Sequence, residues 1–323
     1  MRGGGPRRIG RGNARRRARG RWGNRLQADP RFFLGVDGGA TRCRARLRDA
    51  AGALLAEAEG PAANIYVDFD GAVATVRAQI EAVCAKAGLA AADCARFALG
   101  LGLAGLSSIE DAKRVAARFD QLAGVRAAND AVTACLGAHG GADGALVIAG
   151  TGSAAIARVN GRETVIGGRG FLLGDDGSAA RVGADAVRAA LRAHDGLGPS
   201  SPMTQEVMRR FRDDPLAAIQ WAISAKPSGY GAFSPVVFQL AAADDEVALP
   251  IVRAAARAVD ALIAAVQALG ADRVALVGGL SEPIRPYLAP PSQAALRRPL
   301  FDAVDGAILL AGGALPAREG GKT

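Results

Sequence analysis

Two features within residues 128–153 could do chemistry together, namely a carboxylate and a glycine-rich turn. Asp130 stands at the start of a short apolar segment, and the apolar run Ala145–Ala149 leads into the turn Gly150–Ser153. Glycines in such a turn remove side-chain bulk and permit positive φ. Backbone N–H groups and the two hydroxyl groups can then point at an anion. This pair suggests phosphoryl transfer but does not establish it, because Gly-Thr-Gly also occurs in ordinary hairpins.

A second glycine-rich turn lies near the start of the part that is expected to fold. The apolar segment Phe32–Val36 predicts a strand, which leads into D-G-G-A-T at residues 37–41. An aspartate that faces a threonine across two glycines could bind a metal-bound phosphate. A type I′ or II′ hairpin turn, in which glycine supplies the positive φ, would have the same sequence. Both interpretations stay open for this turn.

The strands around the two turns follow the same pattern twice. Strand, glycine-rich turn, strand, tight turn and strand occur at residues 32–59 and again at 145–167. In the second copy, Asn160-Gly161 is a strong hairpin signal. An internal duplication is the economical explanation. It predicts two similar lobes whose glycine-rich turns meet over a shared cleft.

Helices are expected between and after these strands. Apolar residues at helical spacing predict helices over residues 70–88, 109–122, 178–193, 246–269 and 301–311. The short strand 125–128 delivers Asn129 and Asp130 at its carboxyl end, where ligands gather in open α/β sheets. Asp175 or Asp176 could cap the helix at 178–193 or bind a ligand.

The basic charge of the chain belongs to its first 30 residues. Residues 1–30 hold ten Arg and one Asp, which accounts for the whole net charge of +9. This Gly/Arg-rich arm lacks the apolar periodicity that a fold needs. It could bind RNA or DNA, direct targeting, or be an upstream extension from a misplaced start codon. We favour the extension, because a natural domain start follows at Arg31. The remaining residues are close to neutral, so we expect a nucleic-acid partner only through the arm.

The cysteines and the hydropathy profile narrow the class of protein. Four cysteines are scattered without a CxxC pair, and neither histidine completes a metal site at a recognisable spacing. We therefore expect free, partly buried thiols in a reducing cytoplasm. No apolar run approaches the roughly 20 residues that a membrane helix needs, so no membrane partner is expected. The cysteines are Cys43, Cys84, Cys94 and Cys135.

Three motifs in order carry a resemblance to a known family. D-G-G-A-T at 37–41, I-A-G-T-G-S at 148–153 and V-G-G-L at 277–280 resemble the phosphate and adenosine motifs of the actin/hexokinase/Hsp70 ATPase superfamily. Within it the chain resembles the BadF/BadG/BcrA/BcrD ATPase family, which includes amino-sugar kinases. A-N-I at 63–65, residues 129–139 and G-G-R-G-F-L-L-G-D-D-G-S at 167–178 support this narrower resemblance, which covers roughly residues 32–315.

The resemblance implies an α/β fold of two duplicated actin-like (ribonuclease H-like) ATPase lobes with a central cleft. The expected division is a disordered arm at 1–30, an N-terminal lobe at 31–128 and a C-terminal lobe at 129–323. The implied cofactors are ATP and Mg²⁺, and the implied substrate is a small amino sugar. A homodimer stays open.

The family also implies a role for each matching residue. Asp37 would hold Mg²⁺ through water, and Asp130 would accept the proton of the sugar 6-hydroxyl group as it attacks the γ-phosphate. The residues expected to contact the phosphates of ATP are Gly38, Gly39, Thr41, Gly150, Thr151 and Gly152. Gly278 and Gly279 would let the backbone approach the adenosine. The residues expected near the sugar are Asn64, Asn129, Ser153 and Asp175.

Together these roles predict an ATP-dependent kinase acting on the 6-hydroxyl group of glucosamine. No GxxxxGK[ST] motif is present, which excludes a Walker-type P-loop. Arg169 stands where the N-acetylglucosamine kinases of animals carry Trp, and this favours the sugar without its acetyl group. An Arg facing a cationic amine is unfavourable, so we expect Arg169 to point away from C2.

Other functions of the same fold compete with the glucosamine kinase. N-acetylglucosamine kinase is one alternative, and an ATPase that activates a radical dehydratase is another. Such activators hold an Fe–S cluster through cysteines, yet Cys135 is the last cysteine and precedes the second phosphate motif. A sugar sensor would need a DNA-binding helix-turn-helix, for which residues 1–30 lack the apolar periodicity.

Overall fold

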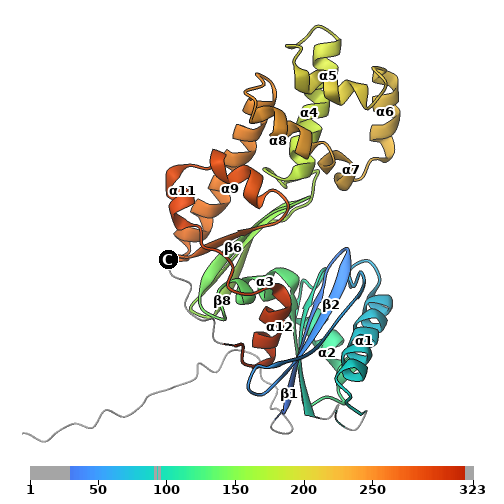
Figure 1. Cartoon of the computed structure of the whole chain (residues 1–323), viewed down its shortest axis with the longest axis vertical. Helices are drawn as coiled ribbons and strands as arrows, with labels where there is room; N and C mark the ends of the chain where they lie inside the picture. Colours follow the sequence, from blue (N-terminus) through green and yellow to red (C-terminus); the bar gives the residue numbers. More distant parts are fainter. Residues whose placement is uncertain (1–29, 91–92, 94–95, 317–323) are drawn as a thin grey trace, which may run out of the picture.

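Two β-sheets lie one above the other, with two helices between them (Figure 1). This computed structural model describes residues 30–90, 93 and 96–316. The arm at residues 1–29 and Cys94 therefore lie outside the described residues. Within the described residues, no helix combines the length and apolar character needed to cross a membrane.

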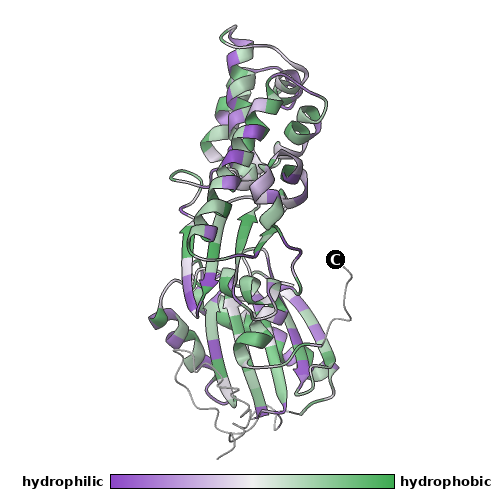
Figure 2. Cartoon of the chain, turned by 90° about the vertical axis from the view of Figure 1, so that its left-hand side faces the viewer, coloured by the Kyte–Doolittle hydropathy of each residue, from purple (hydrophilic) through white to green (hydrophobic). Residues whose placement is uncertain are grey.

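The first sheet is five-stranded, with the order β3-β2-β1-β4-β5. Its strands are β1 (Phe32–Gly38), β2 (Arg42–Asp49), β3 (Leu54–Pro61), β4 (Phe97–Leu103) and β5 (Gly124–Asn129). The first three pair antiparallel, as expected for strands joined by short turns, whereas β4 and β5 are parallel to β1. In β2 the residues alternate as R-C-R-A-R-L-R-D, a period-two pattern typical of a half-buried strand. Helices α1 (Phe69–Lys86) and α2 (Ile109–Ala116) bury their apolar faces against one side of the sheet. In Figure 2 the lower sheet is coloured mostly green, with purple segments where hydrophilic residues interrupt the apolar ones.

The second sheet has the order β8-β7-β6-β9. Its strands are β6 (Gly144–Ala149), β7 (Ser153–Val159), β8 (Arg162–Gly167) and β9 (Val274–Val277). Asn160 and Gly161 both have positive φ, at 52° and 73°, so the predicted hairpin is confirmed. The order β8-β7-β6-β9 reproduces β3-β2-β1-β4, with three antiparallel strands followed by a parallel one. The predicted α/β class and duplicated organisation are thereby confirmed.

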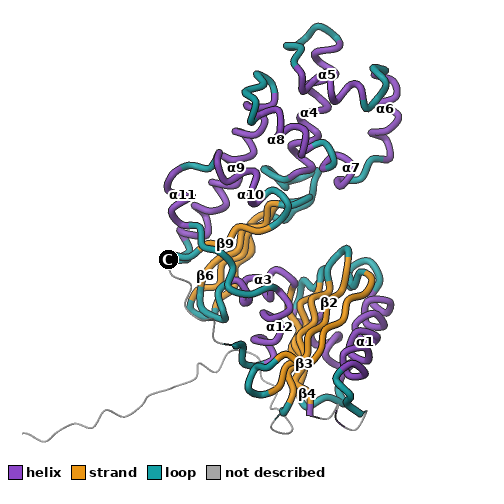
Figure 3. Tube along the Cα trace, in the orientation of Figure 1, coloured by secondary structure: helices purple, strands orange, loops and turns teal. Residues whose placement is uncertain are grey.

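Helices cover the second sheet and extend beyond it (Figure 3). They are α4 (Ala179–His194), α5 (Pro202–Arg209), α6 (Pro215–Ser224), α7 (Pro227–Gly231), α8 (Ser234–Ala241), α9 (Ala248–Ala268), α10 (Ser281–Ile284) and α11 (Pro290–Ala295). Of the two roles left open for Asp175 and Asp176, the structure excludes capping of α4. Ser178 is the N-cap, and its hydroxyl oxygen accepts the N–H of Arg181. The chain reaches that serine only after two more residues, so neither aspartate is in the capping position.

The two helices between the sheets are α3 (Asp130–Ala138) and α12 (Ala303–Ala311) (Figure 1). They pack without side-chain spacers, since a Cβ atom at Gly306 would lie 1.7 Å from the carbonyl oxygen of Thr133. Helix α12 also lies against β1 and β4 of the first sheet. The last described helix thus returns to the first sheet, although it falls within the range 129–323. The lobe boundary between residues 128 and 129 itself stays a prediction.

Candidate functional site

Two carboxylates come together at the carboxyl ends of β1 and β5. Both strands are parallel neighbours of β4, where Asp37 lies opposite Gly102 and Asn129 lies opposite Leu103. Asp130 follows directly as the first residue of α3. The negative charge of Asp37 is close enough to help raise the pKa of Asp130. The fold thus brings the predicted metal-binding carboxylate and the predicted base to the same end of the first sheet.

Asp130 sits in surroundings that make its carboxyl group a stronger base. Burial raises its pKa above the ordinary value, and the charge of Asp37 raises it further, while the N–H of Ala131 opposes the shift. That N–H lies 3.0 Å from Asp130 Oδ1 and 2.9 Å from Asn129 Oδ1. No cation in the described part of the chain pairs with Asp130. A carboxylate with a raised pKa, free of a counter-ion, suits proton abstraction.

Asp37, in contrast, has a cationic partner. Its Oδ2 atom accepts a hydrogen bond from Nη2 of Arg44 at 2.8 Å, and the two residues face each other across the β1–β2 pair. Burial would lower the pKa of Arg44, but the hydrogen bond and the charge of Asp37 raise it overall. No hydrogen bond within the described residues uses Oδ1 of Asp37. This oxygen is the one that a metal-bound water could reach.

The donor set fits Mg²⁺ only if phosphate oxygens complete it. Asp37 and Asp130 supply carboxylate oxygens, the hard ligands that Mg²⁺ prefers. Among the described residues, no group of three or more His, Cys, Asp or Glu side chains could hold a metal ion. Mg²⁺ is commonly bound by one or two carboxylates together with substrate phosphates. The residues present therefore fit a metal that arrives with a nucleotide.

The turn at residues 37–41 is not a type I′ or II′ hairpin turn. None of its residues has positive φ, although both turn types require it. A Cβ atom at Gly38 would instead lie 2.6 Å from Leu103 Cδ2, so glycine is needed there for close packing. The N–H of Gly39 donates to the carbonyl oxygen of Arg42. The N–H groups of Ala40 and Thr41 have no backbone partner among the described residues, so these two can face an anion.

In the second turn, two of the three N–H groups of residues 150–152 have no backbone partner in the described part of the chain. The N–H of Gly150 donates to the carbonyl oxygen of Gly152, whereas the N–H groups of Thr151 and Gly152 have no backbone partner among the described residues. Thr151 is exposed. Gly150 and Gly152 do not use the positive φ that glycine permits. At Gly152 the reason for glycine is space, because a Cβ atom would lie 2.8 Å from Asp175 Oδ2.

Asp175 belongs to the loop between β8 and α4, which is tied to the second turn. It has a positive φ of 59°, which is uncommon outside glycine. The hydroxyl group of Ser153 donates to the carbonyl oxygen of Asp176 at 2.7 Å, and the N–H of Gly168 donates to the carbonyl oxygen of Ser153. Ser153 is buried and holds the loop in place. Contact of Ser153 and Asp175 with a sugar stays a prediction.

The two predicted asparagines lie at the edge of the first sheet and already have local partners. Asn64 Oδ1 accepts the N–H of Tyr66, and Asn129 Nδ2 donates to the carbonyl oxygen of Leu106 at 3.0 Å. Asn129 also caps α3 through its Oδ1 atom. One N–H of Asn129 and both of Asn64 are left for a ligand. Their sugar-binding roles stay predictions.

Gly278 and Gly279 lie beside the second turn. Gly278 has a φ of 102°, and a Cβ atom there would lie 2.4 Å from the carbonyl oxygen of Ala149, directly before Gly150. Around Gly279 the same construction meets nothing within 4 Å. The second sheet therefore gathers the turn 150–153, Asp175 and this glycine pair into one group. Whether this group faces the edge with Asp37 and Asp130 across a shared cleft stays a prediction.

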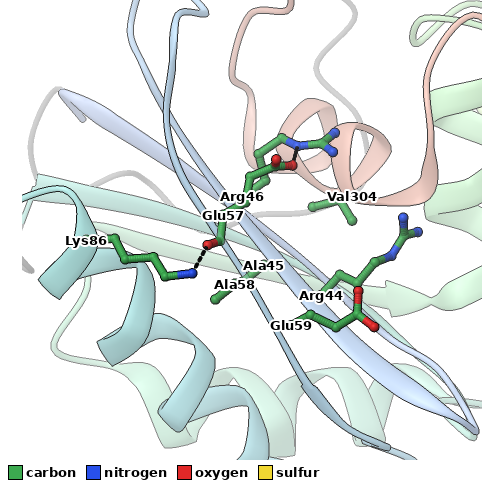
Figure 4. Close-up of a pocket in the computed structure, with 8 residues that line it drawn as sticks. All are labelled: Arg44, Ala45, Arg46, Glu57, Ala58, Glu59, Lys86 and Val304. Atoms are coloured by element: carbon green, nitrogen blue, oxygen red, sulfur yellow. Dashed lines mark hydrogen bonds and ion pairs between the residues drawn. The ribbon is translucent and has the colours of Figure 1, made fainter.

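A cavity of about 390 Å³ lies elsewhere, on β2 and β3 beside α12 (Figure 4). Its charged lining residues are Arg44, Arg46, Glu57, Glu59 and Lys86. These charges are largely satisfied internally, since Lys86 donates to the carbonyl oxygen of Glu57 and Arg46 to its carboxylate. None of the predicted site residues lines the cavity, although Arg44, one of its lining residues, contacts Asp37.

Sequence reasoning missed Arg44. The alternation R-C-R-A-R-L-R-D predicts a half-buried strand, but only its apolar residues were assigned a role, as the buried face. In the structure, Arg44 contacts both Asp37 and Asp302. Four arginines on one face of a single strand are a signal that the face is covered by acidic groups rather than by water alone.

Comparison with known proteins agrees with this geometry. The model of the BadF/BadG/BcrA/BcrD ATPase family matches residues 34–311. The chain is 36% identical over 281 residues to glucosamine kinase GspK of Vibrio cholerae, which spans 87% of this chain and 96% of the relative. It is 31% identical over 264 residues to N-acetyl-D-glucosamine kinase of Dictyostelium discoideum, covering 75% and 81% of the two chains. A crystal structure of a proposed N-acetylglucosamine kinase from Chromobacterium violaceum superposes with a TM-score of 0.77 at 34% identity, covering 88% and 100%.

Proposed function

The chain belongs to the BadF/BadG/BcrA/BcrD ATPase family, and we propose that it transfers the γ-phosphoryl group of ATP to the 6-hydroxyl group of D-glucosamine. The observation that carries the reaction is the placement of Asp130 beside Asp37, buried enough to have a raised pKa and without a cationic partner in the described chain. The substrate follows from the similarity to the Vibrio cholerae glucosamine kinase over nearly its whole length.

Asp130 is the general base of the proposed reaction. Its carboxylate accepts the proton of the 6-hydroxyl group while the sugar oxygen bonds to the γ-phosphorus and the bond to the leaving ADP oxygen breaks. Phosphoryl transfer of this kind depends mainly on in-line positioning and on charge stabilisation. When bound with ATP, Mg²⁺ supplies neutralisation of the phosphate charge. Asp37 would hold it through water, using the Oδ1 atom that Arg44 leaves free.

The two turns and the loop at 167–178 supply the remaining contacts. The free N–H groups of Thr151 and Gly152 favour binding of phosphate oxygens, and Gly38, Gly39 and Thr41 would approach them from the first sheet. The backbone at Gly278 and Gly279 would pack against the adenosine. The residues proposed to bind sugar hydroxyl groups are Asn64, Asn129, Ser153 and Asp175.

N-acetylglucosamine is the second candidate substrate. The Dictyostelium relative and the Chromobacterium structure carry that name, which supports it. Arg169 supports the unacetylated sugar, because the animal N-acetylglucosamine kinases have Trp there. Arg169 is exposed and has no ion pair with a described residue. It can therefore turn away from a cationic amine.

The ATPase activator of a radical dehydratase has less support. No cysteine follows the second phosphate motif, and burial raises the pKa of the Cys43 and Cys135 thiols to about 12. Both are buried free thiols, as the sequence predicted. Reduced thiols also fit our placement of the enzyme in the cytoplasm. A homodimer stays a prediction.

ATP-dependent ADP release with glucosamine, N-acetylglucosamine, glucose or no sugar tests the proposal. We expect release to require a sugar and to be fastest with glucosamine. Preference for N-acetylglucosamine would keep the phosphoryl transfer and overturn the substrate. ADP release that ignores every sugar would overturn the kinase and favour the ATPase activator.

A further inference from the structure

Three arginines of β2 lie in a row on the face that is turned toward the start of α12. Because alternate residues of a strand share a face, Arg44, Arg46 and Arg48 all lie on the side that α12 covers. The opposing acids are Asp302, the N-cap of α12, and Asp305 in its first turn. Figure 4 shows Arg44 and Arg46 extending toward the turn of α12 that carries Val304.

Arg44 differs from Arg46 and Arg48 because it also contacts the candidate site. Its Nη2 atom donates to Asp37 Oδ2 at 2.8 Å, and its Nη1 atom donates to Asp302 Oδ2 at 3.2 Å. Its Nε atom is buried without a hydrogen-bond partner among the described residues. One guanidinium group is therefore held by two aspartates, one at the site and one at the helix.

The two aspartates depend on Arg44 to different degrees. Asp302 also accepts hydrogen bonds from Arg46, at 2.9 and 3.2 Å, and accepts the N–H of Asp305. Arg46 binds Asp305 as well, at 2.9 Å. Asp37 pairs with no cation in the described chain other than Arg44. If Arg44 is replaced, Arg46 still binds Asp302 at the start of α12, whereas Asp37 keeps no cationic partner in the described chain.

We propose that Arg44 is a positioning residue for phosphoryl transfer. It fixes the carboxylate of Asp37 by occupying Oδ2, leaves Oδ1 for the hydrated metal, and ties that carboxylate to the start of α12. It also offsets the negative charge that Asp37 and Asp130 place at one edge. The inference rests on the proposed function, since it concerns how the site receives a metal–nucleotide complex.

Arg44→Gln and Arg46→Gln form a matched pair that tests this role. Each removes one positive charge from the same face of β2, but Arg46 makes more bonds to α12 and none to Asp37. The readout is ADP affinity by calorimetry, with Mg²⁺ and with EDTA, together with kcat and the unfolding midpoint. Hydrogen bonds to charged groups are worth enough for roughly a tenfold change. We expect Arg44→Gln to reduce the gain in ADP affinity from Mg²⁺ about tenfold and Arg46→Gln to preserve it.

A purely structural role gives the opposite ranking. If Arg44 only holds α12 in place, Arg46→Gln lowers the unfolding midpoint and kcat at least as much as Arg44→Gln does. Mg²⁺ then increases the ADP affinity of both variants by the same factor. If Mg²⁺ increases ADP affinity more in Arg44→Gln than in the unaltered protein, Arg44 competes with the metal for Asp37. Either result overturns the inference. Arg44→Lys, which keeps the charge, should restore part of the gain and replaces Arg44→Gln in the comparison if that variant does not fold.

The proposed function fails in a different way. If the unaltered protein binds ADP equally well with Mg²⁺ and with EDTA, or not at all, the metal–nucleotide site itself is refuted. A normal Mg²⁺ gain in the unaltered protein that Arg44→Gln leaves intact refutes only the role of Arg44.

Discussion

Asp130→Asn is expected to lower kcat by roughly 10²–10⁴-fold, the usual contribution of a general base. At 1.36 kcal/mol for each factor of ten, this corresponds to about 3–5 kcal/mol of transition-state stabilisation. Asparagine has nearly the same shape and cannot accept the proton of the sugar hydroxyl group. Sugar binding should be largely kept, because the Nδ2 group of asparagine can donate to the oxygen of the 6-hydroxyl group, where the second carboxylate oxygen of Asp130 would accept from it.

The structure also predicts what happens to stability. Asn129 caps α3 independently, and the oxygen of the new asparagine can accept the N–H of Ala131 as Asp130 Oδ1 does. Burial raises the pKa of Asp130, so the folded state disfavours its charged form. For an acid with a raised folded pKa, this destabilisation is present above that pKa and disappears as pH falls below the unfolded value. At neutral pH the neutral asparagine should therefore unfold at the same temperature or higher.

Three measurements decide the matter: coupled ADP release, glucosamine binding by calorimetry, and thermal unfolding at pH 7.5. The activity of the unaltered enzyme should also fall as pH decreases through the raised pKa of Asp130. Near-normal turnover in Asp130→Asn would remove this residue from the mechanism. Lost turnover accompanied by a clearly lower unfolding temperature would show that Asp130 is needed for the fold, and the argument from its pKa would be refuted.

Two further substitutions test other parts of the structure. Gly152→Ala places a methyl group 2.8 Å from Asp175 Oδ2, so the carboxylate must move. We expect KM for glucosamine to rise several-fold more than in Gly150→Ala, where the methyl group comes no closer than 3.9 Å to another atom, the carbonyl oxygen of Gly152. Equal KM values would separate Asp175 from sugar binding. Burial lowers the pKa of His139, so the folded state resists protonation, and stability should fall as pH drops below the unfolded value of about 6.5. His139→Gln should unfold in urea with a smaller difference between pH 7.5 and 5.5, and an unchanged difference would contradict this explanation.

The strands around the site were predictable because their patterns are local. Residues 42–49 alternate between arginine and small or apolar residues, and β2 occupies that range. Asn160-Gly161 encodes its own turn, since both residues adopt positive φ. Each of these signals depends on neighbours within a few residues. Because the same local pattern occurs twice, the duplication was predictable, whereas the strand order of each sheet was known only from the structure.

The reasons for the glycines were less predictable than their positions. The sequence left open whether Gly38 and Gly152 adopt positive φ or remove side-chain bulk, and in the structure they provide room for Leu103 and Asp175. The sequence does not distinguish a glycine needed for positive φ from one needed for space. Only the packed structure shows which neighbour approaches it. Arg44 was missed for the same reason, because its partner Asp302 lies 258 residues away.

The two carboxylates of the site are held by one pair of helices. Asp130 is the first residue of α3, and Asp37 is connected through Arg44 to Asp302 at the start of α12. The helices are in direct backbone contact, since a Cβ atom at Gly137 would lie 2.0 Å from the carbonyl oxygen of Asp302. Close packing of this kind leaves little room for one helix to slide on the other. The spacing between the proposed base Asp130 and the proposed metal-binding carboxylate of Asp37 is therefore set by the contact of α3 with α12 as well as by β4, which separates β1 from β5. Changes in that contact should alter the reaction without touching any atom that binds the substrate.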